Sequence, residues 1–222
     1  MSAELYHTEL VARARQAFGE GRLAAASASI TLDNPLCGDR VTLDLEGKPI
    51  LCHAVDQALG AGLSEIVVVS GHQAGKVRAV LGERPVKVIE AREHLLGMSA
   101  SLRAGIRALD PKTDAAVVML GDMPQVSAPL IRGLIAAYNP LEGRSIVVPT
   151  VAGKRGNPVL FDRRYFPEML ELEGDVGARH LIGAHDDQVA ELAVEDAAVF
   201  TDVDTPEAYD RLLAKVAPEI LL

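Results

Sequence analysis

The sequence predicts an α/β fold, a three-layer Rossmann-like arrangement in which a mostly parallel sheet carries helices on both faces. Three apolar runs rich in β-branched residues, at 65–71, 115–120 and 145–149, have the length and composition of buried strands. Segments with helical spacing of apolar residues separate them, which favours parallel strands joined by helices. The chain has 222 residues, of which 49% are hydrophobic, enough for one large core. We therefore expect a single domain over residues 1–222.

The individual elements follow from periodicity and from the glycine and proline residues that interrupt it. Up to residue 71 the pattern predicts a helix at 4–18, β-like runs at 27–32 and 41–45 joined by a turn-rich segment at 33–40, a helix at 50–61 and a strand at 65–71. Beyond it the pattern predicts helices at 74–81, 99–109, 164–170 and 177–184, one after Ser127 and one from Thr205 to about 216, and strands at 86–90, 115–120, 145–149, 157–161 and 189–194.

Composition excludes several classes of function. The net charge of −9 argues against a nucleic-acid-binding or acidic-membrane surface. Two cysteines, Cys37 and Cys52, cannot form a disulfide framework and suit a reducing compartment. The first residues lack the form of a signal peptide, and no apolar run approaches the length of a membrane helix. We expect a cytoplasmic protein with no nucleic-acid or membrane partner.

The end of the apolar run at 115–120 is the first candidate site. Gly121 allows close backbone approach, Asp122 is the first charge after the run, and Pro124 prevents the strand from continuing. A carboxylate at the carboxyl end of a parallel strand lies where open α/β sheets bind ligands. The alternative is that Asp122 merely ends a strand or caps a turn.

Two further carboxylates, Asp202 and Asp204, precede a helix that Thr205 and Pro206 begin. Carboxylates from two edges of one sheet can share Mg²⁺, which takes one or two carboxylates together with substrate phosphates. The alternative interpretation is compensation of the helix dipole, and the two interpretations are compatible.

Two other segments are candidates for binding. Gly97, Ser99 and Ser101 stand at the start of a helix, where free N–H groups and hydroxyls suit an anion or a nucleobase edge, although an ordinary serine-capped helix has the same pattern. Residues 153–156 place Lys154 and Arg155 between glycines, as a phosphate clamp or as a solvated hairpin turn. The six histidines show no metal-ligand spacing.

Several motifs in order resemble one known family. They are Gly47-Lys-Pro-Ile-Leu, Val67-Val-Val-Ser-Gly, Gly97-Met-Ser-Ala-Ser-Leu-Arg-Ala-Gly, Gly121-Asp-Met-Pro-Gln-Val, Gly156-Asn-Pro-Val-Leu-Phe, Gly174-Asp-Val-Gly-Ala-Arg and Asp202-Val-Asp-Thr-Pro-Glu. Over about residues 45–215 the chain resembles molybdenum-cofactor nucleotidyltransferases, closest to the molybdopterin cytidylyltransferase branch of the nucleotide-diphospho-sugar transferase type of fold.

This resemblance implies a Mg²⁺-dependent reaction in which a phosphorylated, pterin-type acceptor attacks the α-phosphorus of CTP or GTP and pyrophosphate leaves. The sequence does not choose between the two nucleotides. The implied catalytic residues are Asp122, Arg40 and Lys48, and the implied metal ligands are Asp122 with Asp202 or Asp204. The implied nucleotide and acceptor contacts are Gly97, Met98, Ser99, Ser101, Leu102, Gly121, Asn157 and Arg179.

The first 45 residues depart from the family. Its glycine-rich signature loop is absent, so that residues 27–32 would replace its first strand and residues 33–40 would form a remodelled loop. Within residues 1–45 the chain contains Ser29-Ile-Thr-Leu-Asp-Asn-Pro-Leu-Cys-Gly-Asp-Arg-Val-Thr-Leu after a predicted helix. This segment instead resembles the start of an iron–sulfur scaffold protein of the NifU type, and the resemblance implies that Cys37 is a cluster ligand assisted by Asp39. A lone cysteine cannot hold a cluster within one chain.

Two alternatives to transfer therefore remain open. One is a non-catalytic nucleotide- or cofactor-binding module that lost the phosphate loop. The other is an iron–sulfur assembly protein that bridges a cluster between chains through Cys37, with a molybdoenzyme or an iron–sulfur protein as partner.

Overall fold

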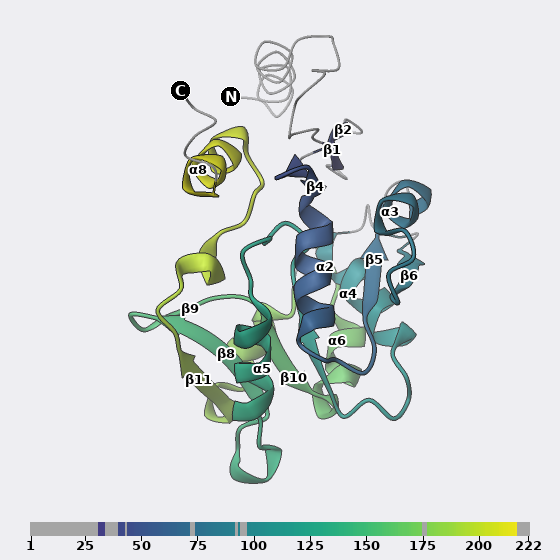
Figure 1. Ribbon diagram of the computed structural model, residues 1–222. Coiled ribbons are helices and arrows are strands. Elements are labelled where there is room, and N and C mark those ends of the chain that lie inside the picture. The colour runs from purple at the N-terminus through teal and green to yellow at the C-terminus, as the bar shows by residue number, and fades with distance from the viewer. Residues whose placement is uncertain are drawn as a thin grey trace, which may run out of the picture.

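The computed structural model describes residues 31–33, 40–42, 44–71, 74–91, 93, 97–174 and 177–216 (Figure 1). Its α-helices are α2 (Ile50–Gly60), α3 (Ala74–Leu81), α4 (Met98–Ala108), α5 (Ala128–Ala137), α6 (Phe166–Glu171), α7 (Arg179–Ala184) and α8 (Pro206–Val216). Its longer strands are β5 (Val67–Ser70), β6 (Lys87–Glu90), β7 (Ala115–Val118), β8 (Ile146–Val151), β10 (Val159–Asp162) and β11 (Val189–Ala193). The helices and strands predicted beyond residue 50 are all present, with their ends displaced by a few residues at most.

The larger sheet has the strand order β11-β8-β10-β7 and is mixed. β8 and β11 are parallel, whereas β10 is antiparallel to both β8 and β7. The chain between β8 and β10 consists of residues 152–158 and includes the short strand β9 (Lys154–Arg155), which is too little for the crossover that a parallel connection needs. The other three long strands, β7, β8 and β11, share one direction, as the predicted parallel arrangement requires, whereas the short β9 is antiparallel to β8.

The strands β5 and β6 form a separate parallel pair, with α3 as their crossover helix. Within the described residues no strand joins β5 to β7. The prediction that residues 115–120 are buried on both faces is therefore wrong here, because all four residues of β7 are only partly buried. A central strand is fully covered only when a neighbour pairs with each of its edges.

Helices cover both faces of the strands, which confirms the three-layer α/β class. In Figure 1, α2 and α5 lie in front of the strands, and α4 and α6 lie behind them. Along β8 the side chains point to the two faces of the sheet in turn, as strand geometry demands: Ile146 and Val148 pack towards α4, α6 and α7, whereas Val147 packs against Leu134 of α5. The side chains of Ile146, Val147 and Val148 are fully buried.

The N-terminal part forms small hairpins. β1 (Thr31–Asp33) pairs with β2 (Arg40–Thr42), and β3 (Asp44–Leu45) pairs with β4 (Lys48–Pro49). The described end of the predicted first strand, residues 31–32, therefore belongs to a hairpin and not to the central sheet. The predicted helix at 4–18 lies outside the described residues. No helix within the described part of the chain is long and apolar enough to span a membrane.

Candidate functional site

Asp122 lies in the turn after β7, at the carboxyl end of that strand, as its sequence position predicts. Gly121 precedes it, and a Cβ there would lie 3.0 Å from Leu51 Cδ1, so glycine lets the turn pack closely against α2. Just beyond the turn, the Ser127 hydroxyl accepts a hydrogen bond from the Leu130 N–H at 3.4 Å and so caps α5. Strand end and helix start thus hold the carboxylate from both sides.

The segment that carries Asp202 and Asp204 is attached to this turn through Val203. The Val203 N–H donates to the Asp122 carbonyl oxygen at 3.0 Å. The Val203 side chain is fully buried in a cluster with Leu45, Ile50, Tyr209 and Leu212. Because residues on either side of an extended residue point away from its buried face, Asp202 and Asp204 are exposed next to Asp122. The sequence analysis missed this anchoring role, although a valine between two aspartates is a visible signal.

The carboxylate of Asp122 has an unusual environment. Burial raises the pKa of Asp122, its own backbone N–H acts in the opposite direction, and the charges of Asp202 and Asp204 raise the pKa further. Its Oδ1 atom is buried and has no hydrogen-bond partner among the described residues. A buried acceptor without a donor is costly unless a ligand or ion completes it.

These features fit a divalent cation shared with a phosphorylated ligand. They do not form a complete protein cage, because within the described ranges no group of three His, Cys, Asp or Glu side chains is arranged to hold a metal. Mg²⁺ binds in many enzymes through one or two carboxylates while substrate phosphates and water supply the rest. The structure therefore brings Asp202 and Asp204 near Asp122 without gathering the three into one preformed cluster.

The start of α4 forms a second part of the site. Gly97 precedes the helix with φ of 108°, a conformation open to glycine but strained for other residues. The Ser99 hydroxyl is fully buried and has no hydrogen-bond partner among the described residues, so it does not cap the helix. The Ser99 N–H donates to the Gly174 carbonyl at 3.3 Å and ties α4 to the loop before α7.

One cavity of about 380 Å³ brings several predicted residues together. Met98, Ser101, Leu102 and Gly121 line it, together with Gly177 from the loop that precedes α7. A Cβ on Gly177 would lie 2.6 Å from the Met98 sulfur, so this glycine permits the loop to close over the start of α4. Gly177 belongs to the motif at residues 174–179 that the sequence analysis identified, although only Arg179 of that motif was named as a site residue.

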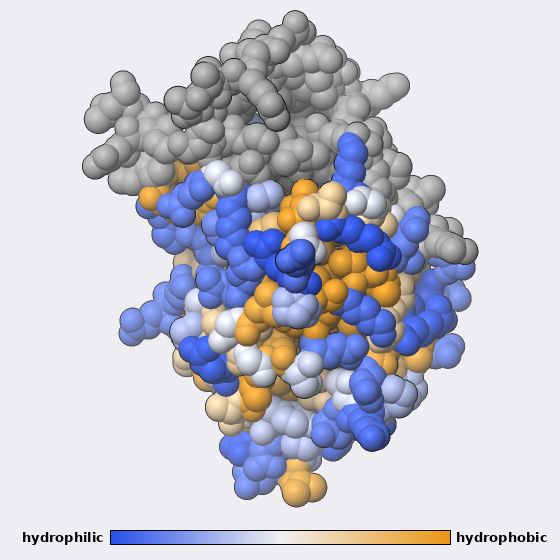
Figure 2. Space-filling view, turned by 45° about the vertical axis from the view of Figure 1, so that its right-hand side comes forward, coloured by the Kyte–Doolittle hydropathy of each residue, from blue (hydrophilic) through white to orange (hydrophobic). Residues whose placement is uncertain are grey.

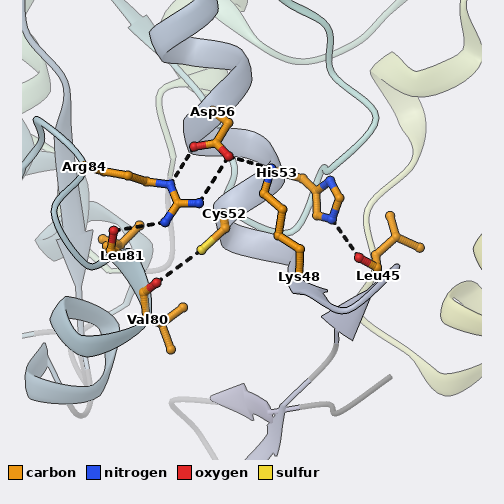
Figure 3. Close-up of polar contacts among 8 residues, drawn as sticks. All are labelled: Leu45, Lys48, Cys52, His53, Asp56, Val80, Leu81 and Arg84. Carbon is orange, nitrogen blue, oxygen red and sulfur yellow. Dashed lines mark hydrogen bonds and ion pairs between the residues drawn. The ribbon is translucent and has the colours of Figure 1, made fainter. Parts of the chain in front are cut away.

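Of the two cationic residues predicted to be catalytic, Lys48 and Arg40, the structure describes the side chain of Lys48 alone. Lys48 lies in β4, and its ammonium forms an ion pair with Asp56 of α2 at 2.5 Å (Figure 3). Arg84 binds the same carboxylate at 2.5 Å, and this hydrogen bond, with the help of Lys48, lowers the pKa of Asp56 to about 2. The ammonium of Lys48 is thus engaged by a neighbouring carboxylate. Arg40 lies in β2, and its side chain is outside the described atoms.

The turn at residues 153–156 is a hairpin whose cations are also engaged. Arg155 binds Glu191 at 2.8 Å and Asp186 at 2.7 Å, and Lys154 lies 4.6 Å from the centre of the Phe200 ring. Of the two interpretations of this segment, the structure favours the hairpin turn over the phosphate clamp. Arg179 donates to the Arg155 carbonyl at 3.3 Å and lies beside the same hairpin.

Asn157 follows this hairpin and is held by the segment that leads to Asp202. Its N–H donates to the Val199 carbonyl at 3.0 Å. A Cβ on the preceding Gly156 would lie 2.6 Å from that carbonyl oxygen, so only glycine fits the contact. The hairpin therefore helps to fix the segment that leads to Asp202 and Asp204.

The cysteines and histidines do not add a metal centre to the described part of the chain. Cys52 is buried in α2 and donates to the Val80 carbonyl at 3.5 Å, which agrees with its predicted helical position. His53 donates to the Leu45 carbonyl at 2.9 Å, and His185 pairs with Glu168 at 2.7 Å. Cys37, His72 and His94 lie outside the described residues.

The chain is similar to several known proteins in sequence and in structure. Purine catabolism protein PucB of Bacillus subtilis (strain 168) is 27% identical over 181 residues, which cover 78% of this chain and 86% of PucB. The structure of Rv0371c in complex with manganese, from Mycobacterium tuberculosis H37Rv, is 32% identical and superposes with a TM-score of 0.66 over 78% of this chain and 89% of that one.

A nucleotidyl transferase from Methanothermobacter thermautotroptrophicus (Mth528) superposes with a TM-score of 0.69 at 21% identity, over 83% of this chain and 89% of that one, which shows the shared fold. The family of MobA-like NTP transferase domains matches residues 35–189, well over half of the sequence. The prediction of a nucleotidyltransferase is confirmed as far as the NTP transferase family, and this match does not single out the molybdenum-cofactor branch. The chain belongs to the family of MobA-like NTP transferase domains.

Proposed function

We propose that this chain transfers a nucleoside monophosphate from CTP or GTP to a phosphorylated small-molecule acceptor, with a pterin-type acceptor such as molybdopterin as the first to test. One observation carries the proposal: Asp122, at the carboxyl end of β7 and beside Asp202 and Asp204, has a buried carboxylate oxygen with no hydrogen-bond donor among the described residues. Membership of an NTP transferase family supports the same reaction class.

In this reaction an acceptor phosphate oxygen attacks the α-phosphorus while the bond to the β-phosphate bridging oxygen breaks and pyrophosphate leaves. Asp122 and either Asp202 or Asp204 would hold a divalent ion, Mg²⁺ or Mn²⁺. Such an ion supplies positive charge to the phosphate oxygens. The buried start of α4 would orient the base and ribose, with Gly97 and Gly177 allowing the ligand close to the backbone. Catalysis of this kind rests on positioning and charge neutralisation.

The test is a calorimetric titration of the full chain with CTP, GTP and ATP, with and without Mg²⁺ or Mn²⁺. We expect one triphosphate to bind in roughly the micromolar range only when the metal is present. Asp122→Asn should abolish the metal-dependent part, whereas Asp187→Asn, which changes an exposed carboxylate of the same charge, should leave it unchanged. Equal binding by wild type and Asp122→Asn would contradict the proposed role of Asp122.

A second candidate is a binding module without catalysis. The observation that favours it is the engagement of Lys48 by Asp56 and of Arg155 by Glu191 and Asp186, which leaves these cations less available for phosphates. This candidate predicts nucleotide binding with no release of pyrophosphate when metal, nucleotide and molybdopterin are combined. Metal-dependent pyrophosphate release that Asp122→Asn abolishes would exclude it.

A further inference from the structure

The charges around Asp122 do not balance those of a nucleoside triphosphate. Asp202 and Asp204 add negative charge beside it, and the cations of Lys48 and Arg155 are held by other carboxylates. Figure 2 shows a continuous hydrophobic area in the middle of the face seen there, and such an area offers no charge to an anion. One divalent ion neutralises only part of a triphosphate, so the site calls for cations from another element.

The helix α8 borders this site from two directions. It begins directly after the carboxylate segment, where the Thr205 hydroxyl caps it by accepting a backbone N–H at 3.1 Å. Its residues Tyr209 and Leu212 are buried in one cluster with Leu45 and Ile50. The helix therefore packs against the chain that follows the remodelled loop expected in place of the family's glycine-rich loop.

The last turn of α8 reaches the turn that carries Asp122. The Lys215 ammonium donates to Gln125 Oε1 at 3.5 Å, and Gln125 follows Asp122 by three residues. Three residues of chain span at most about 10 Å. Backbone hydrogen bonds donated by Met123 and Val126 fold this stretch into turns and shorten the path further. Lys215 therefore lies at the rim of the candidate site.

Lys215 and Arg211 form a pair of exposed cations on one side of α8. They are four residues apart, so their side chains are neighbours on the helix surface. Among the ion pairs of the described residues, none includes either side chain. The amide of Gln125 is neutral and leaves the charge of Lys215 unbalanced. Like charges at this spacing repel each other, and a phosphate bound between them would remove the repulsion.

The chemistry and the place of this pair fit the outer part of a triphosphate. The planar guanidinium of Arg211 can bind two phosphate oxygens at once, and Lys215 adds a point charge on a flexible side chain. Lys215 contacts Gln125 and not the Asp122 carboxylate. The pair is therefore closer to phosphates at the rim than to an α-phosphorus next to a metal at Asp122.

We propose that Arg211 and Lys215 bind the outer phosphates of the nucleoside triphosphate and the pyrophosphate that its cleavage releases. The inference rests on the proposed function and adds two phosphate-binding residues to it. The pair supplies positive charge in a chain from which the family's glycine-rich signature loop is absent.

The test is a calorimetric titration of the full chain with inorganic pyrophosphate in the presence of Mg²⁺, repeated with CTP and GTP. Lys215→Gln should weaken pyrophosphate binding about threefold or more, and the double variant with Arg211→Gln about tenfold or more. Lys215→Arg keeps the charge and should retain most of the affinity.

Arg107→Gln is the matched control, because Arg107 is an exposed cation in the last turn of α4, as Lys215 is in the last turn of α8. Both substitutions remove a cation that interacts favourably with a helix dipole, but only Lys215 contacts the Asp122 turn. Arg107→Gln should therefore leave the pyrophosphate affinity unchanged.

The salt dependence of binding separates a direct contact from a structural effect. The wild-type affinity for pyrophosphate should fall as KCl is raised, and this fall should be less steep in the double variant, which has lost two of the screened charges. A purely structural role would lower the melting temperature and leave the salt dependence as it is in the wild type, which would count against the inference.

The outcomes distinguish this inference from the proposed function. Unchanged pyrophosphate affinity in the double variant, or no binding of pyrophosphate by the wild type, would overturn the inference, while metal-dependent binding of CTP or GTP would still support the proposed function. Conversely, pyrophosphate binding that the double variant weakens, in a chain that binds neither CTP nor GTP, would support the phosphate site and contradict nucleotide transfer. The single variant Lys215→Gln decides the matter if the double variant fails to fold.

Discussion

The two regions of this molecule contain similar apolar strands but bury them to different extents. In the sheet of β11, β8 and β10, the side chains of Ile146, Val147 and Phe161 are fully buried. In the pair of β5 and β6, exposed or partly buried positions predominate. The difference teaches that hydrophobicity makes a strand capable of burial, but paired edges and covering helices on both sides are what bury it.

The two regions also differ in what holds them together. A continuous apolar cluster joins β8 and β10 to α4, α6 and α7. Around β5 and β6, a smaller apolar cluster is supplemented by a polar network in which Asp56 of α2 binds both Lys48 and Arg84. Substitutions in the first region should therefore destabilise the chain more than substitutions in the second.

The largest effect is expected from Phe161→Ala in β10. Removing a fully buried aromatic side chain lowers the free energy of unfolding by about 3–5 kcal/mol. Leu141→Ala is the control, because Leu141 is 96% exposed and its loss should change stability by less than about 0.5 kcal/mol. Urea denaturation followed by circular dichroism measures both. A cost below 1 kcal/mol for Phe161→Ala would contradict the close packing of this region.

A smaller effect in the same region is expected from Tyr138→Phe. The Tyr138 hydroxyl donates to Asp162 Oδ2 at 2.6 Å, and Asp162 is only 5% exposed. Burial acts to raise the pKa of Asp162, but the hydrogen bonds from Tyr138 and Arg164 outweigh it and lower that pKa. Loss of the hydroxyl should therefore cost about 1–3 kcal/mol at neutral pH. Thermal unfolding of the wild type and of Tyr138→Phe at pH 7 checks this value.

In the second region Asp56→Asn should cost about 1 kcal/mol, after allowance for solvent screening of a carboxylate that is 35% exposed. Its pKa is lowered from 3.8 to about 2, so the ionised form stabilises the fold above pH 3.8. This contribution is lost as the pH falls from 3.8 towards 2. Melting temperatures of wild type and Asp56→Asn should therefore differ at pH 6 and converge at pH 2. A constant difference would mean that the charge of Asp56 is not its cause.

The smallest effect, of opposite sign, is expected where the two regions meet, from Asp122→Asn. The folded-state pKa of Asp122 is raised, so its ionised form opposes folding above that pKa. Removing the charge should stabilise the metal-free chain by about 0.5–1 kcal/mol at pH 8, and the gain should disappear as the pH falls below the unfolded-state pKa. Calorimetric melting with a chelator present measures the gain. A less stable variant at pH 8 would show that Asp122 has a structural partner.

Much of the fold was predictable because local patterns determine it. The helix at residues 74–81 coincides with α3, and Ser127 caps α5 as expected. The antiparallel direction of β10 was not predicted, because the periodicity of a strand carries no information about its direction. The partial exposure of β7 was missed for a related reason: burial depends on neighbours that are distant in the sequence.

The candidate site was predicted in part. Asp122, Asp202 and Asp204 were chosen from their places after a strand and before a helix, and the structure places them near one another. The anchoring of that segment by the Val203 N–H was not foreseen, and neither was the pairing of Lys48 with Asp56. The first contact joins residues that are far apart in the chain, and the second joins two neighbouring elements, β4 and α2. A sequence motif does not encode the geometry of either contact.

By itself the sequence determined the order of the helices and strands, the family motifs and the residue types available for chemistry, because these depend on local periodicity and composition. Only the tertiary structure decided which carboxylate oxygen is buried with no donor among the described residues, which cations are already engaged, and which residues line the same cavity. Those properties depend on distances between elements that the chain brings together when it folds, and the free energy of a buried or paired group depends on those distances.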